Sequence, residues 1–101
     1  MANSTVKSNT KQQTEALRAL KILSHESRLK ILTLLLDDKA DPCVGDIARA
    51  VGLSQSATSH QLAKLEAWGV IEGRRRGQTI CYRPTDTGLT KRVKRIIKAL
   101  S

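Results

Sequence analysis

The sequence predicts a mainly α-helical fold that carries one small β-hairpin. Apolar residues recur at spacings of three and four from about Lys11 to Trp68, which is typical of amphipathic helices. After Gly69 the spacing changes to two, so residues 70–74 and 79–83 indicate two strands joined by a turn at residues 75–78. Helical spacing returns after Pro84. We therefore expect five helices, four before the hairpin and one after it.

Residues 1–10 are polar and show no periodicity, so we expect a flexible tail followed by a single domain over residues 11–101. The first helix then places Ala16, Leu17, Leu20 and Leu23 at helical spacing. The second helix, which we expect Ser24 to cap, is apolar nearly all round and is predicted to be the most buried. Its apolar residues are Leu29, Ile31, Leu32, Leu34, Leu35 and Leu36.

A tight turn joins the next two helices. Residues 44–51 predict a short helix, and Gly52 ends it as a left-handed glycine would. Ser54 then caps a helix that runs to about Trp68. Two helices joined by Gly52-Leu53-Ser54 form a helix-turn-helix, and the hairpin that follows makes the order that of a winged helix-turn-helix. The inward face of the second of these helices is expected to hold Thr58, Leu62, Leu65 and Trp68.

The last helix is expected to begin at Thr85 or Asp86. Its apolar face holds Leu89, Val93, Ile96, Ile97 and Leu100.

The charge balance favours a polyanionic partner. The chain has 101 residues with 18 Lys and Arg against 9 Asp and Glu, a formal net charge of +9. No 18-residue apolar run and no apolar signal-peptide core are present, so we expect no membrane partner and a cytoplasmic location. Two cysteines far apart in sequence do not make a secreted disulfide framework.

The helix after Ser54 carries short polar side chains that suit a DNA major groove. Gln55 can bond an adenine edge, Ser56 and Ser59 can bond a base or a phosphate, and a helix N-terminus favours phosphate. The alternative is that these polar side chains only face solvent on a surface helix and do not contact DNA. The candidate DNA contacts on this helix are Ser54, Gln55, Ser56, Ser59, His60 and Lys64.

The predicted hairpin favours DNA binding over a merely solvated surface. Arg74, Arg75, Arg76 and Gln78 are placed to clamp a phosphate backbone or enter a minor groove, against the alternative of a solvated charged turn. A general RNA binder would usually show exposed aromatics, and this chain has one Trp, one Tyr and no Phe. We therefore expect double-stranded DNA as the partner. A non-specific nucleic-acid or protein-interaction role remains the alternative.

The stretch from about Ala19 to Thr85 resembles the ArsR/SmtB family of dimeric metal- and redox-responsive repressors. The residues that carry the resemblance are Leu23–Leu32, Cys43–Ala48, Ser54–Leu62, Gly69–Ile71, Arg76–Gln78 and Tyr82. The resemblance implies a homodimer joined through the first and last helices, a recognition helix at Ser54–Trp68 and a wing at Ile71–Arg83. It also implies a repressor that an inducer releases from operator DNA.

The inducer stays open, and we expect no cofactor. Family members often bind metal through Cys-x-x-Asp, and Cys43 and Asp46 match that spacing, but the tail supplies no Cys or His and the last helix has no His. A thiol-redox response through Cys43 and Cys81 is the rival, because Cys43 precedes the short helix, where winged domains often add a brief strand beside the wing. Both cysteines can equally be small buried hydrophobes, and a constitutive DNA-binding protein needs no inducer.

We expect no enzyme activity. A catalytic set needs an orienting acid and a pocket, and the adjacent Ser59 and His60 point in different directions on one helix. Arg28, at the start of the second helix, is expected to be structural and to pair with an acid or a helix end.

Overall fold

The computed structural model describes the backbone of residues 2–37 and 40–101, and side chains from residue 10 onward within those ranges. Its elements confirm the predicted five helices and one antiparallel hairpin. In chain order they are α1 (Ala2–Leu23), α2 (Glu26–Asp37), α3 (Val44–Val51), α4 (Gln55–Ala67), β1 (Ile71–Arg76), β2 (Thr79–Pro84) and α5 (Gly88–Leu100).

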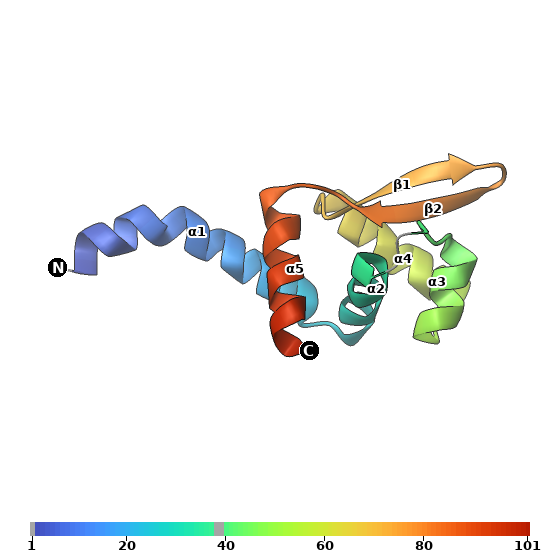
Figure 1. Ribbon diagram of the computed structural model, residues 1–101, viewed down its shortest axis with the longest axis horizontal. Helices are drawn as coiled ribbons and strands as arrows, with labels where there is room; N and C mark the ends of the chain where they lie inside the picture. The colour runs from blue at the N-terminus through green and yellow to red at the C-terminus, as the bar shows by residue number, and fades with distance from the viewer. Residues whose placement is uncertain (1, 38–39) are drawn as a thin grey trace.

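The molecule is elongated, with principal extents of 56 × 23 × 22 Å. Figure 1 shows why: the N-terminal half of α1 projects from the body at one end, and the hairpin with α3 forms the other end. The C-terminal half of α1 packs on α5 and on α2. The winged helix-turn-helix thus lies at the end opposite the projecting helix.

Helix α2 is the centre of the core, as its apolar sequence predicts. It contacts α1, α3, α4 and β2, and it buries Ile31, Leu32 and Leu35. Fully burying one such side chain contributes about 1.5–3 kcal/mol. Aliphatic side chains thus stabilise the core of a chain that has no Phe. The other buried members of this hydrophobic cluster are Ala19, Ile22, Leu23, Ile47, Leu62, Leu65, Val70, Ile71, Tyr82, Leu89 and Val93.

Residues 2–10, expected to form a flexible tail, are the first turns of α1. They contain neither Gly nor Pro, so a helix nucleated over residues 11–23 can extend through them. Met1 lies outside the described residues. Mobility of this segment in solution stays a prediction, as does the domain boundary at residue 11.

Two capping predictions were wrong. The Ser24 hydroxyl donates to the Lys21 carbonyl at 2.8 Å, so Ser24 closes α1 rather than capping α2. The last helix begins later than expected, because Thr87 is its N-cap and accepts from the Thr90 amide at 3.1 Å. The Thr85 hydroxyl instead bonds the Gly69 carbonyl at 2.6 Å.

Within the described residues, no helix is both long and apolar enough to cross a membrane.

Candidate nucleic-acid interface

The turn between α3 and α4 has the conformation that its sequence predicts. Gly52 has φ 74° and ψ 33°, the left-handed conformation that ends a helix, and its amide donates to the Ala48 carbonyl at 2.9 Å. Ser54 then caps α4, because its hydroxyl accepts from the Ala57 amide at 3.0 Å. These two local signals fix how α4 follows α3.

Helix α4 divides into a buried and an exposed face. Thr58, Leu62 and Leu65 are fully buried, as predicted, while Trp68 is 39% exposed and therefore not a core residue. All six candidate contacts on this helix lie on the surface, and its first turn carries no acidic side chain. The exposed face of the N-terminal half of α4 is thus mainly polar. The exposed candidates are Ser54, Gln55, Ser56, Ser59, His60 and Lys64.

The hairpin is longer than predicted, and its turn is tighter. Arg75 and Arg76, expected in the turn, lie in β1 opposite Ile80 and Thr79. The turn is only Gly77-Gln78, and Gly77 has φ 61°, which a two-residue hairpin turn requires of its glycine. Side chains alternate along a strand, so Arg74 and Arg76 point to one face of the wing and Arg75 to the other. The four candidate residues Arg74, Arg75, Arg76 and Gln78 are all exposed.

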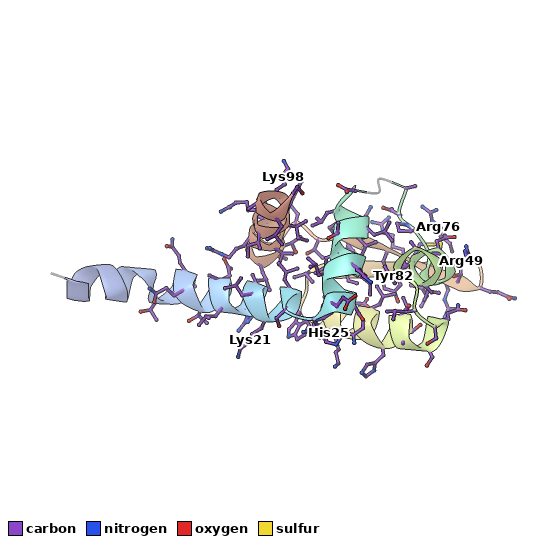
Figure 2. The ribbon with its side chains drawn as sticks, turned by 90° about the horizontal axis from the view of Figure 1, so that it is seen from below. Lys21, His25, Arg49, Arg76, Tyr82 and Lys98 are labelled. Atoms are coloured by element: carbon purple, nitrogen blue, oxygen red, sulfur yellow. A yellow bond between two sulfur atoms is a disulfide. The ribbon has the colours of Figure 1, made fainter. Side chains whose placement is uncertain are left out.

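The wing and the recognition helix are joined at their base. The Val70 amide donates to the Leu65 carbonyl at 3.2 Å, and the Gly73 amide donates to the Glu66 carboxylate at 3.4 Å. The hairpin base is therefore held relative to the end of α4. Figure 2 shows Lys98 of α5 well away from the labelled Arg76 of the wing.

Cys43 and Cys81, 38 residues apart, are joined by a disulfide. They also form an isolated antiparallel bridge, and the Tyr82 amide donates to the Pro42 carbonyl at 2.9 Å, so a single bridged residue lies where a brief strand beside the wing was expected. Cys81 is buried and pairs with Arg74 across the hairpin. The disulfide thus connects the residue before α3 with a wing strand that lies beside a candidate contact.

The Cys43–Asp46 pair has other partners in this structure. One Asp46 oxygen accepts from the Cys43 amide at 3.2 Å, and the other pairs with Arg49 at 2.6 Å. The sulfur of Cys43 is bonded to Cys81. No group of three or more His, Cys, Asp or Glu side chains gathers into a potential metal site within the described part of the chain.

Sequence reasoning placed Arg28 at a helix end but missed what else it reaches. Its guanidinium donates to the Ile22 carbonyl at 2.9 Å and the Lys21 carbonyl at 3.0 Å, at the end of α1. It also reaches Gln61 of α4 and lies over the Trp68 ring, 5.1 Å from the centroid. The sequence did not predict the contact of Gln61 with Arg28 or that of Glu66 with the Gly73 amide, because neither contact leaves a periodic signal.

Comparisons with known proteins agree with this geometry. A family model described as bacterial regulatory protein, arsR family, matches residues 25–72. The transcriptional activator HlyU of Vibrio cholerae is 38% identical over 77 residues, which cover 76% of this chain and 69% of HlyU. The regulator NmtR of Mycobacterium tuberculosis is 44% identical over 68 residues, 67% of this chain and 55% of NmtR.

Solved structures share the fold along nearly the whole chain. The transcriptional repressor BigR from Xylella fastidiosa has a TM-score of 0.77 at 29% identity, covering 92% of this chain and 90% of that one. The homodimeric winged helix-turn-helix DNA-binding domain of Mb0332 from Mycobacterium bovis has a TM-score of 0.67 at 28% identity, covering 90% and 79%. With its helix-turn-helix, its wing and these relatives, the chain belongs to the ArsR/SmtB family of DNA-binding transcriptional regulators.

Proposed function

We propose that the protein is a homodimeric repressor that binds an inverted repeat in double-stranded DNA. The observation that carries the proposal is that the polar face of α4 and the three wing arginines are all exposed, on a chain with a net charge of +9. A relative described as a repressor, BigR, supports this direction of regulation, whereas HlyU is described as an activator. A role in binding DNA supports a cytoplasmic location for the protein.

Exposed apolar residues on the terminal helices support a dimer. Leu17 is 59% exposed, Leu20 51% and Leu100 66%, on helices that pack against each other. A monomer gains nothing from these side chains, whereas a second copy would bury them. The homodimeric state of the Mb0332 domain supports pairing through α1 and α5.

Base reading and backbone clamping are assigned to different elements. In a dimer, the two α4 helices enter successive major grooves about 34 Å apart. Gln55 and Ser59 are one turn apart on the exposed face and make base contacts, with Ser56 and His60 beside them. The Ser54 end of α4, Lys64 and the wing residues Arg74, Arg75, Arg76 and Gln78 bind phosphates.

Selection of bound duplexes from a random library tests this assignment. The wild-type protein should enrich an inverted repeat with half-site centres one helical turn apart. Gln55→Ala should relax the preference at one position per half-site by about 1–3 kcal/mol while leaving non-specific affinity unchanged. Enrichment of no symmetric sequence would contradict the proposal.

A second proposal concerns control of DNA binding, and the disulfide favours it: the protein responds to thiol redox state through Cys43 and Cys81. Formation of the bond removes two electrons and two protons from the two thiols. Hydrogen peroxide accepts the two electrons and the two protons, and its O–O bond breaks to give two molecules of water. With the bond in place, the wing strand and the start of α3 move as one body, so less freedom is lost on docking.

Anisotropy with reduced and peroxide-oxidised protein tests the redox proposal. The oxidised form should bind its operator roughly 3- to 10-fold more tightly, the gain expected from ordering one or two fewer groups on binding. Cys81→Ser should remove the difference, and a protein with equal affinities in both states would contradict redox control. Binding lost only when Zn²⁺ is added would favour the alternative at Cys43 and Asp46.

A further inference from the structure

We propose that Arg28 is a positioning residue that sets the spacing between the two DNA half-sites, by fixing the recognition helix relative to the dimerisation helix. This inference rests on the proposed function, because it needs a dimer joined through α1 that reads DNA with α4. Arg28 itself lies on α2 and is half-buried.

One guanidinium contacts both helices. At the end of α1 it donates to the Ile22 carbonyl and to the Lys21 carbonyl, which also accepts from the Ser24 hydroxyl and amide. A cation there is also favoured by the negative end of the helix dipole. On the other side it reaches the Gln61 amide oxygen at 3.5 Å and the ring of Trp68, the C-cap of α4.

Direct packing between α1 and α4 does not replace this contact. Helix α1 packs mainly on α2 and α5, and α4 packs mainly on α2, α3 and β1. Between α1 and Trp68 lies a surface cleft of about 370 Å³ instead of a packed interface. The residues that line the cleft are Thr14, Leu17, Arg18, Lys21, Ile22 and Trp68. Both helices also pack on α2, so the Arg28 bridge adds a direct polar link of defined geometry to that shared packing.

The planar guanidinium is suited to this role in a way that another cation is not. Its donors lie in a rigid fork, so two carbonyls, one amide oxygen and one ring face can be engaged together. A lysine carries its three donors on a single nitrogen, so it could not reach partners that Nε, Nη1 and Nη2 of Arg28 contact separately. Because two copies of the bridge act in a dimer, a small change in the angle at each is doubled in the separation of the recognition helices.

Half-site spacing is the measurable consequence. Each base pair added between half-sites moves one of them by about 3.4 Å and rotates it around the duplex. A dimer with fixed recognition helices should lose at least about tenfold in affinity per base pair of mis-spacing, which is comparable to a mismatched base pair. A dimer in which the α4 angle varies should lose less.

The experiment measures the affinity of the wild-type protein and of three variants for a duplex series in which the spacer varies by one base pair in each direction. Arg28→Met keeps the unbranched stem and removes the bridge, and its loss per base pair should fall to about threefold or less. Gln61→Ala removes only the acceptor on α4, leaves α1 capped and should broaden the profile in the same direction. Arg18→Met, a change in a cation that lines the same cleft without reaching α4, should keep the wild-type profile.

The possible results distinguish a failure of the positioning role of Arg28 from a failure of the proposed function. A sharp wild-type profile with an equally sharp profile for both Arg28→Met and Gln61→Ala would overturn the positioning role. If Arg28→Met fails to fold, the Gln61→Ala profile decides. A wild-type protein with no sequence-selective binding at all would instead overturn the proposed function, and the positioning role with it.

Discussion

Removing one wing arginine should change the salt dependence of DNA binding by a calculable amount. Arg75 lies in β1 opposite Ile80, is exposed, and has no ion pair among the residues that the structure describes. Arg83, by contrast, is paired with Glu72 at 3.0 Å. The guanidinium of Arg75 is therefore available to neutralise a phosphate in each protomer of the proposed dimer.

The magnitude follows from counterion release. Each phosphate contact contributes about 0.9 to the slope of log affinity against log salt, so Arg75→Ala should lower the slope of a dimer by about 1.8. Between 50 and 200 mM salt, the wild-type affinity should then fall roughly 12-fold further than that of the variant. The variant should also weaken binding to all duplexes alike, because phosphates carry no sequence information.

Fluorescence anisotropy at several salt concentrations measures the slope. Lys98→Ala is the control, since it also removes one positive charge but lies on α5, away from the wing in Figure 2. The control should leave the slope nearly unchanged. An unchanged slope for Arg75→Ala, or equal changes for both variants, would show that the wing does not contact the backbone.

Three further predictions concern stability. The Thr58 hydroxyl is fully buried and lacks a hydrogen-bond partner among the described residues. Thr58→Val should therefore stabilise the fold by about 1 kcal/mol and raise the Tm measured by calorimetry by roughly 4–8 °C. A lower Tm for the variant would mean that the hydroxyl is hydrogen-bonded. Ser54→Ala removes the cap of α4 and should cost about 1 kcal/mol in urea unfolding, with Ser56→Ala, which caps nothing, as the neutral control. Burial, with a smaller effect of Glu66, raises the pKa of Tyr82 above its ordinary value of 10.0; the unfolded chain therefore loses this proton at lower pH, and the free energy of unfolding should fall as pH rises above that value. Tyr82 is the only tyrosine, so tyrosinate absorbance reports its titration directly, and a pKa at or below the ordinary value would contradict the burial argument.

Local signals in the sequence predicted the helix-turn-helix well. Gly52 and Ser54 are residues whose conformational preference decides a helix end and a helix start, and both have the predicted role. The buried face of α4 followed from its spacing for Thr58, Leu62 and Leu65. The same spacing placed Trp68 inward, which was wrong because the helix ends at Ala67 and the ring instead lies against Arg28.

Contacts between distant residues could not be predicted in this way. Thr85, Asp86 and Thr87 are all good capping residues, and only the folded structure shows that the Thr85 hydroxyl is occupied by Gly69. The Arg28–Gln61 contact joins residues 33 positions apart, and no periodicity records such a pair. The roles of the candidate DNA contacts stay predictions, because exposure shows that a side chain is available and not what it binds.

The central claim is that α4 and the wing together recognise a particular duplex. Its most direct test is fluorescence anisotropy of the purified protein on the DNA upstream of its own gene, against a scrambled duplex of equal length at physiological salt. The account predicts binding to the upstream DNA at least about 10³-fold tighter than to the scrambled duplex. Equal affinity for the two duplexes would contradict it and leave only the charge of the molecule to explain its binding.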